Sequence, residues 1–193
     1  MSRLLLILVL ILPASAKNLL RNGSFEGGTL YWHDAKPLVE GGKDSQYAMH
    51  IEKGWSLSAP FVAEKDQSYT ISLWVKASKD KGTISIGMSP MAREVANKAK
   101  RIWNKKATQD FNVTNEWKRV SATFKADVPQ NGFWPKPHYG IFLGGKNVLV
   151  DGVTLTEGTQ STSDYIPRKS LEVVADCTNL PGFEGSKGNI FEQ

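Results

Sequence analysis

Residues 68–77 read Ser68-Tyr69-Thr70-Ile71-Ser72-Leu73-Trp74-Val75-Lys76-Ala77. Apart from Trp74, apolar and polar side chains alternate along this stretch, and a period of two residues is that of a β-strand with one buried face. The alternation predicts that Trp74 lies on the face opposite the core. The side chains predicted to enter the core are those of Tyr69, Ile71, Leu73 and Val75.

Short stretches with the same alternation follow one another along most of the chain, separated by Gly, Asp, Asn and Pro. They cover residues 46–52, 57–63, 83–88, 109–113, 117–126, 138–143 and 147–156, with a turn expected at 144–147. Many short strands at this spacing are typical of an all-β sandwich of antiparallel sheets.

One segment breaks the strand pattern. Ser89 can cap a helix and Pro90 is tolerated at its first position. From there to Lys106 the apolar residues fall at helical spacing, namely Ala92, Val95, Ala96, Ala99, Ile102 and Trp103. We therefore expect one short amphipathic helix inserted between two strands.

The two ends of the chain differ from its strand-rich middle. Residues 1–16 combine Arg3, an apolar run at 4–12 and a small-residue cleavage site at 14–16. This is the pattern of a secretory signal peptide, and the apolar run is too short to span a membrane. We expect secretion to the extracellular space or the periplasm, a β-sandwich module over 17–157, and a linker or tail over 158–193 that can be the start of a further domain.

The composition excludes several classes of protein. The 193 residues include 24 Lys and Arg against 19 Asp and Glu, a net charge of +5, and one cysteine, Cys177. One cysteine excludes a disulfide framework and a Cys-rich zinc module. So mild a charge does not require nucleic acid and we expect none, although the basic residues between Arg93 and Lys106 leave an anionic glycan or nucleic acid open.

Motifs of catalysis are missing from the sequence. There is no G-x-S-x-G, H-E-x-x-H, phosphate-binding loop or dinucleotide fingerprint. The acidic residues that a glycosidase pairs across its substrate are mostly isolated in predicted loops. We therefore predict no catalytic residue, and whether the chain belongs to an enzyme stays open.

Two motifs at the ends of the strand-rich region resemble those of a known family. The opening motif is Asn18-Leu19-Leu20-Arg21-Asn22-Gly23-Ser24-Phe25-Glu26-Gly27-Gly28, with Trp32 after it, and the closing motif is Val148-Leu149-Val150-Asp151-Gly152-Val153-Thr154-Leu155. Residues 69–77 and 116–120 match between them. In this order the motifs resemble the CenC-like carbohydrate-binding modules of families 4, 9 and 22, over about residues 18–157.

The resemblance implies a jelly-roll β-sandwich that binds polysaccharide or oligosaccharide and is usually attached to a secreted glycoside hydrolase. Residues 188–192 also look like the start of a further β domain in such enzymes. The predicted function is thus a secreted, non-catalytic carbohydrate-binding module that targets a glycoside hydrolase. The alternative is an extracellular adhesion or scaffolding β-sandwich that contacts protein or cell wall without binding sugar.

A sugar platform needs flat apolar side chains for the C–H faces of the rings and a few polar groups for the hydroxyls. Trp74 is the first candidate, although a loop or the inserted helix covering it as a second small core fits equally well. If residues 139, 141 and 143 are core, Phe142 and His138 point with Trp74 toward the concave side. A surface histidine without a ligand stays open for His138. Trp103 and Trp134 are further candidates, each with a packing role as the alternative.

The resemblance also implies a structural calcium ion, which takes six to eight oxygen ligands. Glu26 and Asp151 are the carboxylates at the matching positions, because the first and last strands of a jelly roll are neighbours. Asp44, with backbone oxygens at 43–45, is expected to complete the shell. The other interpretation is that Glu26 and Asp151 only accept hydrogen bonds from turn amides.

Overall fold

The computed structural model describes residues 18–93, 99–101, 108–126 and 138–159. In these residues it contains ten strands, paired antiparallel, and no helix, so none that could cross a lipid bilayer. The strands are β1 (Trp32–His33), β2 (Leu38–Glu40), β3 (Tyr47–Ser58), β4 (Phe61–Val62), β5 (Ser68–Ala77), β6 (Gly82–Arg93), β7 (Ala99–Arg101), β8 (Thr108–Val113), β9 (Lys118–Lys125) and β10 (His138–Glu157).

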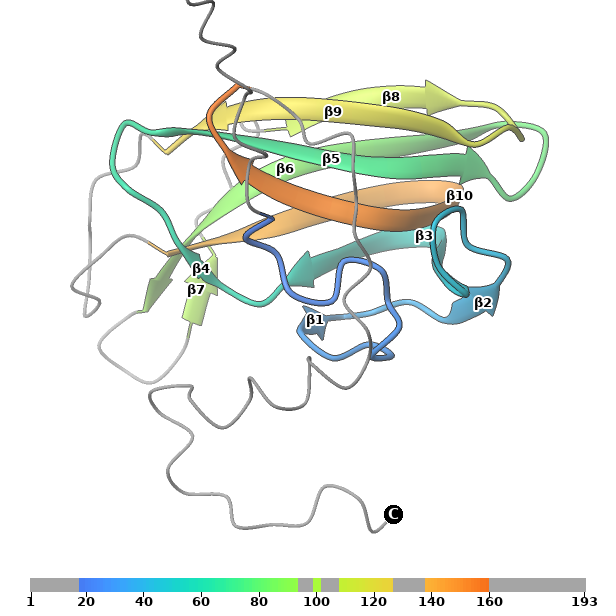
Figure 1. Ribbon diagram of the computed structural model, residues 1–193, viewed down its shortest axis with the longest axis horizontal. Coiled ribbons are helices and arrows are strands. Elements are labelled where there is room, and N and C mark those ends of the chain that lie inside the picture. Colours follow the sequence, from blue (N-terminus) through green and yellow to red (C-terminus); the bar gives the residue numbers. More distant parts are fainter. Residues whose placement is uncertain (1–17, 94–98, 102–107, 127–137, 160–193) are drawn as a thin grey trace, which may run out of the picture.

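The strands form two layers that share their two longest members, β3 and β10 (Figure 1). In sheet one, the second half of β10 pairs with β5 and with the first half of β3, while β9 and β2 lie outside them. In sheet two, the first half of β10 pairs with β6 and with the second half of β3, while β8 and β1 lie outside them. The short strands β4 and β7 pair with β10 and β6. This confirms the predicted all-β jelly-roll sandwich.

Both shared strands change, between the two sheets, which of their residues face the core. On β10 the buried residues are Ile141 and Leu143 in sheet two but Val148 and Val150 in sheet one. On β10 the change occurs at Asn147, whose φ is 54°. On β3 it occurs near Gly54, which lies opposite Gly145 and has a φ of 117°. Glycine adopts this backbone conformation without steric cost, and so allows one strand to serve both sheets.

The core lies between the two layers and takes side chains from both. The positions predicted from the alternation of β5 are all buried there, which confirms that prediction: Tyr69, Ile71, Leu73 and Val75. The hydroxyl of Tyr69 accepts a hydrogen bond of 2.9 Å from the backbone N–H of Glu64. Burial raises the pKa of the Tyr69 hydroxyl, because the charged phenolate would lose its hydration.

The predicted helix at 89–106 is wrong wherever the structure describes that segment. Strand β6 continues to Arg93, and residues 99–101 form β7 beside it. Ser89 and Pro90 lie opposite Gly140 and Tyr139 of β10, so the backbone of this part of β6 is already paired. Pairing with a long neighbouring strand outweighs the helical spacing of small apolar side chains. Residues 94–98 and 102–107 lie outside the described part.

Two predicted breaks between strands are also absent. The stretch 144–147 is no turn, because β10 runs through it with continuous pairing to β3. Likewise β3 runs without a break from Tyr47 to Ser58, so it contains most of the predicted strand 46–52 and the first two residues of the predicted strand 57–63. Within the rest of 57–63, Phe61–Val62 form the separate strand β4. The expected signal peptide and nearly all of the expected tail lie outside the described residues.

Candidate functional site

The outward face of sheet two carries two aromatic side chains. On β10, Phe142 alternates with the buried Ile141 and Leu143, so it points away from the core. On β3, Trp55 lies directly opposite Gly144 of β10, two residues from Phe142. Directly opposed residues of an antiparallel pair share a face, and so Trp55 and Phe142 project from the same side of the molecule.

Trp55 and Phe142 form a stacked pair, which we call the aromatic patch. Their ring centroids are 6.4 Å apart and the ring planes differ by 25°. The far edge of the Phe142 ring covers Gly144: a Cβ atom at Gly144 would lie 2.8 Å from both Cε1 and Cζ of the ring. A glycine at this position therefore lets the ring lie low on the sheet.

Polar groups lie beside the aromatic patch in neighbouring rows of the same face. Ser85 of β6 is opposite Gly144, and Asp110 of β8 is opposite Ser85. His138 begins β10 and is half-buried, four residues before Phe142 and thus on the same face. This face therefore combines flat apolar rings with hydroxyl, carboxylate and imidazole groups, the two kinds of group that a sugar platform needs.

Trp74 lies on the other outward face, that of sheet one. Its neighbours there are Arg119 of β9 and Asp151 of β10. The indole N–H donates a 2.5 Å hydrogen bond to the carboxylate of Asp44, and the charged groups of Lys43 and Arg119 lie 5.5 and 5.6 Å from the ring centroid. The loop before β3 thus contacts Trp74 through Lys43 and Asp44. Such a contact is expected if a loop covers Trp74, which was one of the two interpretations of this residue.

The structure brings together only part of the predicted sugar platform. Phe142 and His138 share a face, whereas Trp74 belongs to the opposite sheet, with the core between them. Trp103 and Trp134 lie outside the described residues. Trp55 was missed because Gly54 shifts the alternation of β3, so that a pattern counted from residues 46–52 does not extend to it. A glycine directly before a tryptophan inside an alternating stretch is the signal that would have found it.

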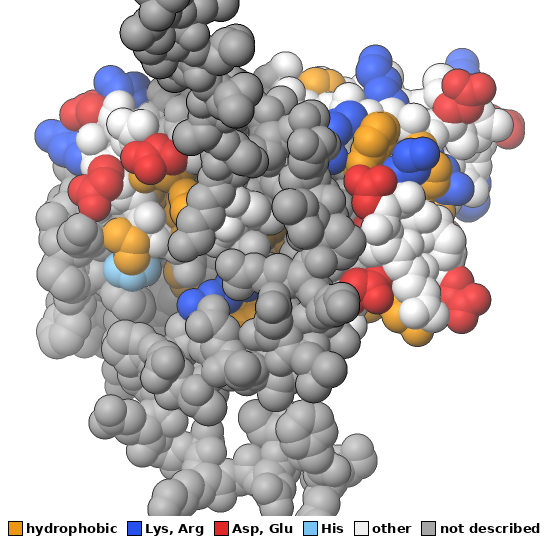
Figure 2. Space-filling view, in the orientation of Figure 1, with side chains coloured by type: hydrophobic (Ala, Val, Ile, Leu, Met, Phe, Trp, Pro, Cys, Tyr) orange, Lys and Arg blue, Asp and Glu red, His pale blue; other side chains and the backbone are white. Residues whose placement is uncertain are grey.

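Figure 2 shows one side of the molecule, where charged side chains of both signs surround hydrophobic ones at the right-hand end. On the other sheet, Asp151 of β10 is fully buried. Its Oδ2 accepts hydrogen bonds from the backbone N–H groups of Lys43 and Asp44, at 2.6 and 2.9 Å. Its Oδ1 accepts one of 2.6 Å from the N–H of Gly152. Asp151 thereby ties the loop before β3 to β10.

The side-chain hydroxyl of Ser45 is surrounded by oxygen atoms. It lies 3.0 Å from the carbonyl oxygen of Ser24, 2.8 Å from that of Tyr47 and 2.6 Å from Oδ1 of Asp151. A hydroxyl has one proton and can donate to only one of the three. The remaining oxygens face one another without a proton between them. Hard oxygen ligands in such a cluster fit a calcium ion.

The three predicted calcium ligands are not gathered at that cluster. Oε1 of Glu26 accepts the backbone N–H groups of Gln46 and Tyr47, at 2.7 and 3.3 Å, and so borders the same loop. The carboxylate of Asp44 instead accepts a hydrogen bond from the indole N–H of Trp74. In the part of the chain that the structure describes, no three His, Cys, Asp or Glu side chains converge. Calcium here stays a prediction, and its ligands would be mostly backbone and hydroxyl oxygens.

Comparison with known proteins gives a family and several similar folds. The family model described as "carbohydrate binding domain", CBM 4/9, matches residues 17–134. No curated protein sequence matches the chain. Among solved structures, a family 16 carbohydrate-binding module is 17% identical, with a TM-score of 0.48, over 72% of this chain and all of that one. The CBM22-1–GH10 modules of a Clostridium thermocellum xylanase 10B, complexed with xylohexaose, are 19% identical, with a TM-score of 0.45, over 69% of this chain and 27% of that one.

Proposed function

The chain belongs to the carbohydrate binding domain family of CBM 4/9, and from this premise we propose that it is a non-catalytic module that binds polysaccharide on the outward face of sheet two. The observation that carries the placement is the stacked pair of Trp55 and Phe142, which points away from the core. Rings in this position offer apolar area to a ligand at little conformational cost, because each has only two side-chain torsions.

In the proposed binding mode, the C–H faces of successive sugar rings pack on the aromatic patch. Apolar contact supplies most of the affinity, as in other sites lined by aromatic side chains. Ser85, Asp110 and His138 flank the patch and offer donors and acceptors to the sugar hydroxyls. These polar groups orient the chain, because a hydroxyl left without a partner loses the hydrogen bonds it had in water.

Two finer parts of the proposal rest on the sequence. Secretion rests on the signal-peptide pattern of residues 1–16, and it predicts that the exported protein begins at Lys17, which N-terminal sequencing tests. Targeting of a glycoside hydrolase rests on the family resemblance and on residues 188–192. An increase in polysaccharide hydrolysis when this module is fused to a matched hydrolase, compared with the hydrolase alone, tests that role.

Binding is tested by calorimetry and affinity electrophoresis of the full chain against neutral β-glucans and xylans. We expect Trp55→Ala and Phe142→Ala each to weaken binding about tenfold or more, which corresponds to a loss of about 1.4 kcal/mol or more. Trp117→Ala is the matched control, because Trp117 lies away from the aromatic patch. The Nζ atom of Lys76 lies over its ring, 4.9 Å from the centroid.

Two results would contradict the proposal. Failure of the folded wild type to bind any polysaccharide would leave the adhesion or scaffolding role as the better explanation. If Trp74→Ala abolishes binding while Trp55→Ala does not, the binding face is that of sheet one.

We also propose calcium at the oxygen cluster around Ser45. Held by Ser24, Tyr47 and Asp151, the ion would join the opening segment to β3 and β10 and stabilise the fold. A ligand at 100 times its Kd stabilises a protein by about 2.7 kcal/mol. We expect millimolar Ca²⁺, but not Mg²⁺, to raise the urea midpoint over that in EDTA, and Asp151→Asn to reduce the difference between the Ca²⁺ and EDTA midpoints, because Asp151 is the one carboxylate in the cluster. Identical midpoints with Ca²⁺ and EDTA would exclude calcium and leave the sugar proposal untouched.

A further inference from the structure

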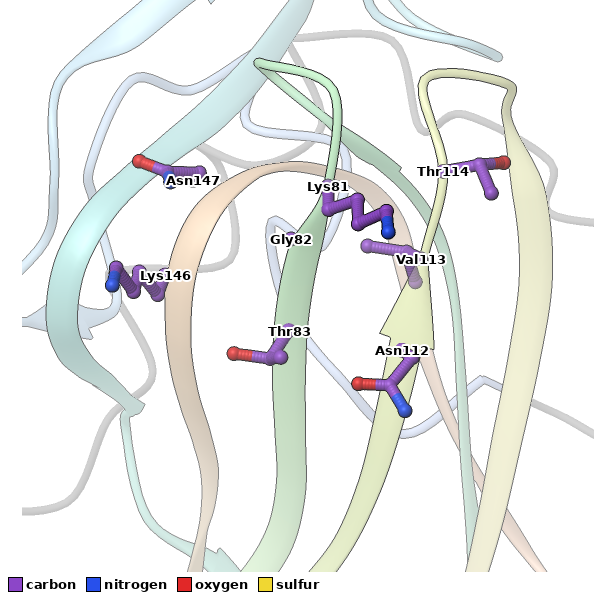
Figure 3. A pocket seen from close by; sticks show the side chains of 8 residues that line it. All are labelled: Lys81, Gly82, Thr83, Asn112, Val113, Thr114, Lys146 and Asn147. Atoms are coloured by element: carbon purple, nitrogen blue, oxygen red, sulfur yellow. The ribbon is translucent and has the colours of Figure 1, made fainter.

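A pocket of about 570 Å³ lies at one end of the outward face of sheet two (Figure 3). Strands β6, β8 and β10 supply its walls. Its lining consists of Lys81, Gly82, Thr83, Asn112, Val113, Thr114, Lys146 and Asn147. None of these eight residues is acidic, and six of them carry a side chain that can donate a hydrogen bond.

The register places this pocket on the same face as the aromatic patch. Lys146 lies opposite Thr83, and Thr83 lies opposite Asn112. This row is two residues beyond the pair Gly144 and Ser85, so it alternates onto the same side of the sheet. From Phe142 to Lys146 the strand advances four residues, about 13 Å. A polysaccharide that lies along β10 over the patch therefore reaches the pocket.

Positive charge gathers at this end of the face. Lys81 and Lys146 are exposed, and within the described residues neither has an ion-pair partner. Lys53 of β3 lies directly opposite Lys146 of β10. Like charges directly opposed across two strands destabilise a sheet. An anion bound beside the two ammonium groups would relieve this repulsion.

The acidic residues nearest to the pocket, in sequence or in strand register, do not line it. Glu52 is 3.8 Å from Lys79 and forms an ion pair with it. Asp110 belongs to the row nearer the aromatic patch, and Asp80 precedes Lys81 in the turn before β6. Glu116 follows the lining residue Thr114 by two positions, and none of Asp80, Asp110 and Glu116 lines the pocket.

The labelled side chains show how an anion would be received (Figure 3). The hydroxyl of Thr83 points toward β10, and the amide oxygen of Asn112 points from β8 toward β6. Lys81 extends toward Val113 on β8, and Lys146 extends from β10 on the side nearer β3. The ammonium groups of Lys81 and Lys146 thus lie on two sides of the polar side chains of Thr83 and Asn112. Because the lysine side chains are flexible, both can turn toward a bound group.

We propose that Lys53, Lys81 and Lys146 make this end of the face a subsite for an anionic group of the polysaccharide, either a uronic acid carboxylate or a sulfate ester. The inference rests on the proposed function, because the anionic group arrives on a chain whose neutral part lies over Trp55 and Phe142. Charge-assisted hydrogen bonds from lysine and from Thr83 and Asn112 would select it over a neutral sugar. The ligand class is thus an acidic polysaccharide rather than a neutral one.

The experiment uses calorimetry of the full chain with matched polymers: a neutral xylan, the same backbone bearing glucuronic acid, and a sulfated form. We expect the wild type to bind an acidic form about tenfold more tightly than the neutral one, with an advantage that shrinks as salt rises. Lys81→Gln and Lys146→Gln should each reduce the affinity for the acidic form about two- to fivefold, the worth of one exposed ion pair. The control Lys65→Gln removes an exposed lysine from the loop after β4.

The outcomes separate this inference from the proposed function. Equal affinity for neutral and acidic polymers, or equal effects of Lys146→Gln and Lys65→Gln, would overturn the anionic subsite and leave the sugar platform in place. Loss of binding to every polysaccharide would mean that the proposed function itself fails. If single-stranded DNA binds as tightly as the acidic polymer, with the same dependence on the lysines, the polysaccharide subsite is overturned in favour of a phosphate-binding surface. Preference for carboxylate or for sulfate identifies the source of the charge.

Discussion

Gly144 and Phe142 are two residues apart on β10 and face the same way, with the ring edge over the glycine. An alanine at position 144 would place its Cβ 2.8 Å from Cε1 and Cζ of the ring, closer than two carbon atoms approach in proteins. The ring is the movable partner, because it can turn about its side-chain torsions. The sheet would stay intact while the aromatic patch loses its shape.

We therefore expect Gly144→Ala to weaken polysaccharide binding about three- to tenfold and to lower the free energy of unfolding by less than about 1 kcal/mol. Calorimetry and urea denaturation measure the two effects. In a Phe142→Ala background the same change should have no further effect on binding, since the ring that it displaces is gone. An equal loss in both backgrounds would show that Gly144 acts without Phe142.

Tyr69 links stability to alkaline pH at the residue scale. Burial raises its pKa above the ordinary value of about 10. A raised pKa in the folded state means that the stabilisation is complete below the unfolded pKa and is lost as pH rises through the folded one. We expect the free energy of unfolding to fall more steeply between about pH 9.5 and 11 in the wild type than in Tyr69→Phe.

Urea denaturation across that range measures both slopes. Tyr69→Phe also removes the acceptor of the Glu64 amide, a constant cost of about 1 kcal/mol, and so only the slopes are compared. Parallel slopes would show that the Tyr69 hydroxyl does not titrate differently in the two states.

At the scale of the element, β3 and β10 depend on single residues where each passes from one sheet to the other. Gly54 has a φ of 117°, and a Cβ there would meet only Lys36, at 3.6 Å or more. The cost of a side chain at position 54 is therefore one of backbone conformation and not of collision.

We expect Gly54→Ala to lower the free energy of unfolding by about 1–3 kcal/mol, and to weaken sugar binding because Trp55 is the next residue. The companion variant Asn147→Gly, at a φ of 54° on the partner strand, should change stability by less than about 1 kcal/mol. Urea denaturation gives both values. A neutral Gly54→Ala would mean that β3 can pass between the sheets with ordinary backbone angles.

These elements also show what local pattern can predict. Strand β5 was predicted with its boundaries and its buried residues, because it lies in the middle of sheet one and its alternation is uninterrupted. The end of β6 was predicted as helix, because its extended state depends on β10, some 50 residues away. Phe142 and His138 could be predicted from the alternation of their own strand. Trp55, and the separation of Trp74 from Phe142, could not, since both depend on the passage of β3 and β10 between sheets.

At the scale of the whole molecule, two sheets that share β3 and β10 have one core and no boundary at which to separate. We expect a single unfolding transition in urea, with coincident midpoints from far-ultraviolet circular dichroism and tryptophan fluorescence. Trp74 reports on sheet one and Trp55 on sheet two, so Trp74→Phe and Trp55→Phe should each retain coincident transitions. Two separate midpoints would show that the sheets unfold independently.

The position of β10 in the chain has a consequence for biosynthesis. β10 is the central partner of β3, β4, β5 and β6, and it follows all of them in sequence. Neither sheet can close until residues up to about Glu157 have left the ribosome, and pairings over such sequence distances form slowly. The pairs β2–β3, β5–β9 and β6–β8 can form before β10 is translated, but neither sheet is completed until β10 joins them.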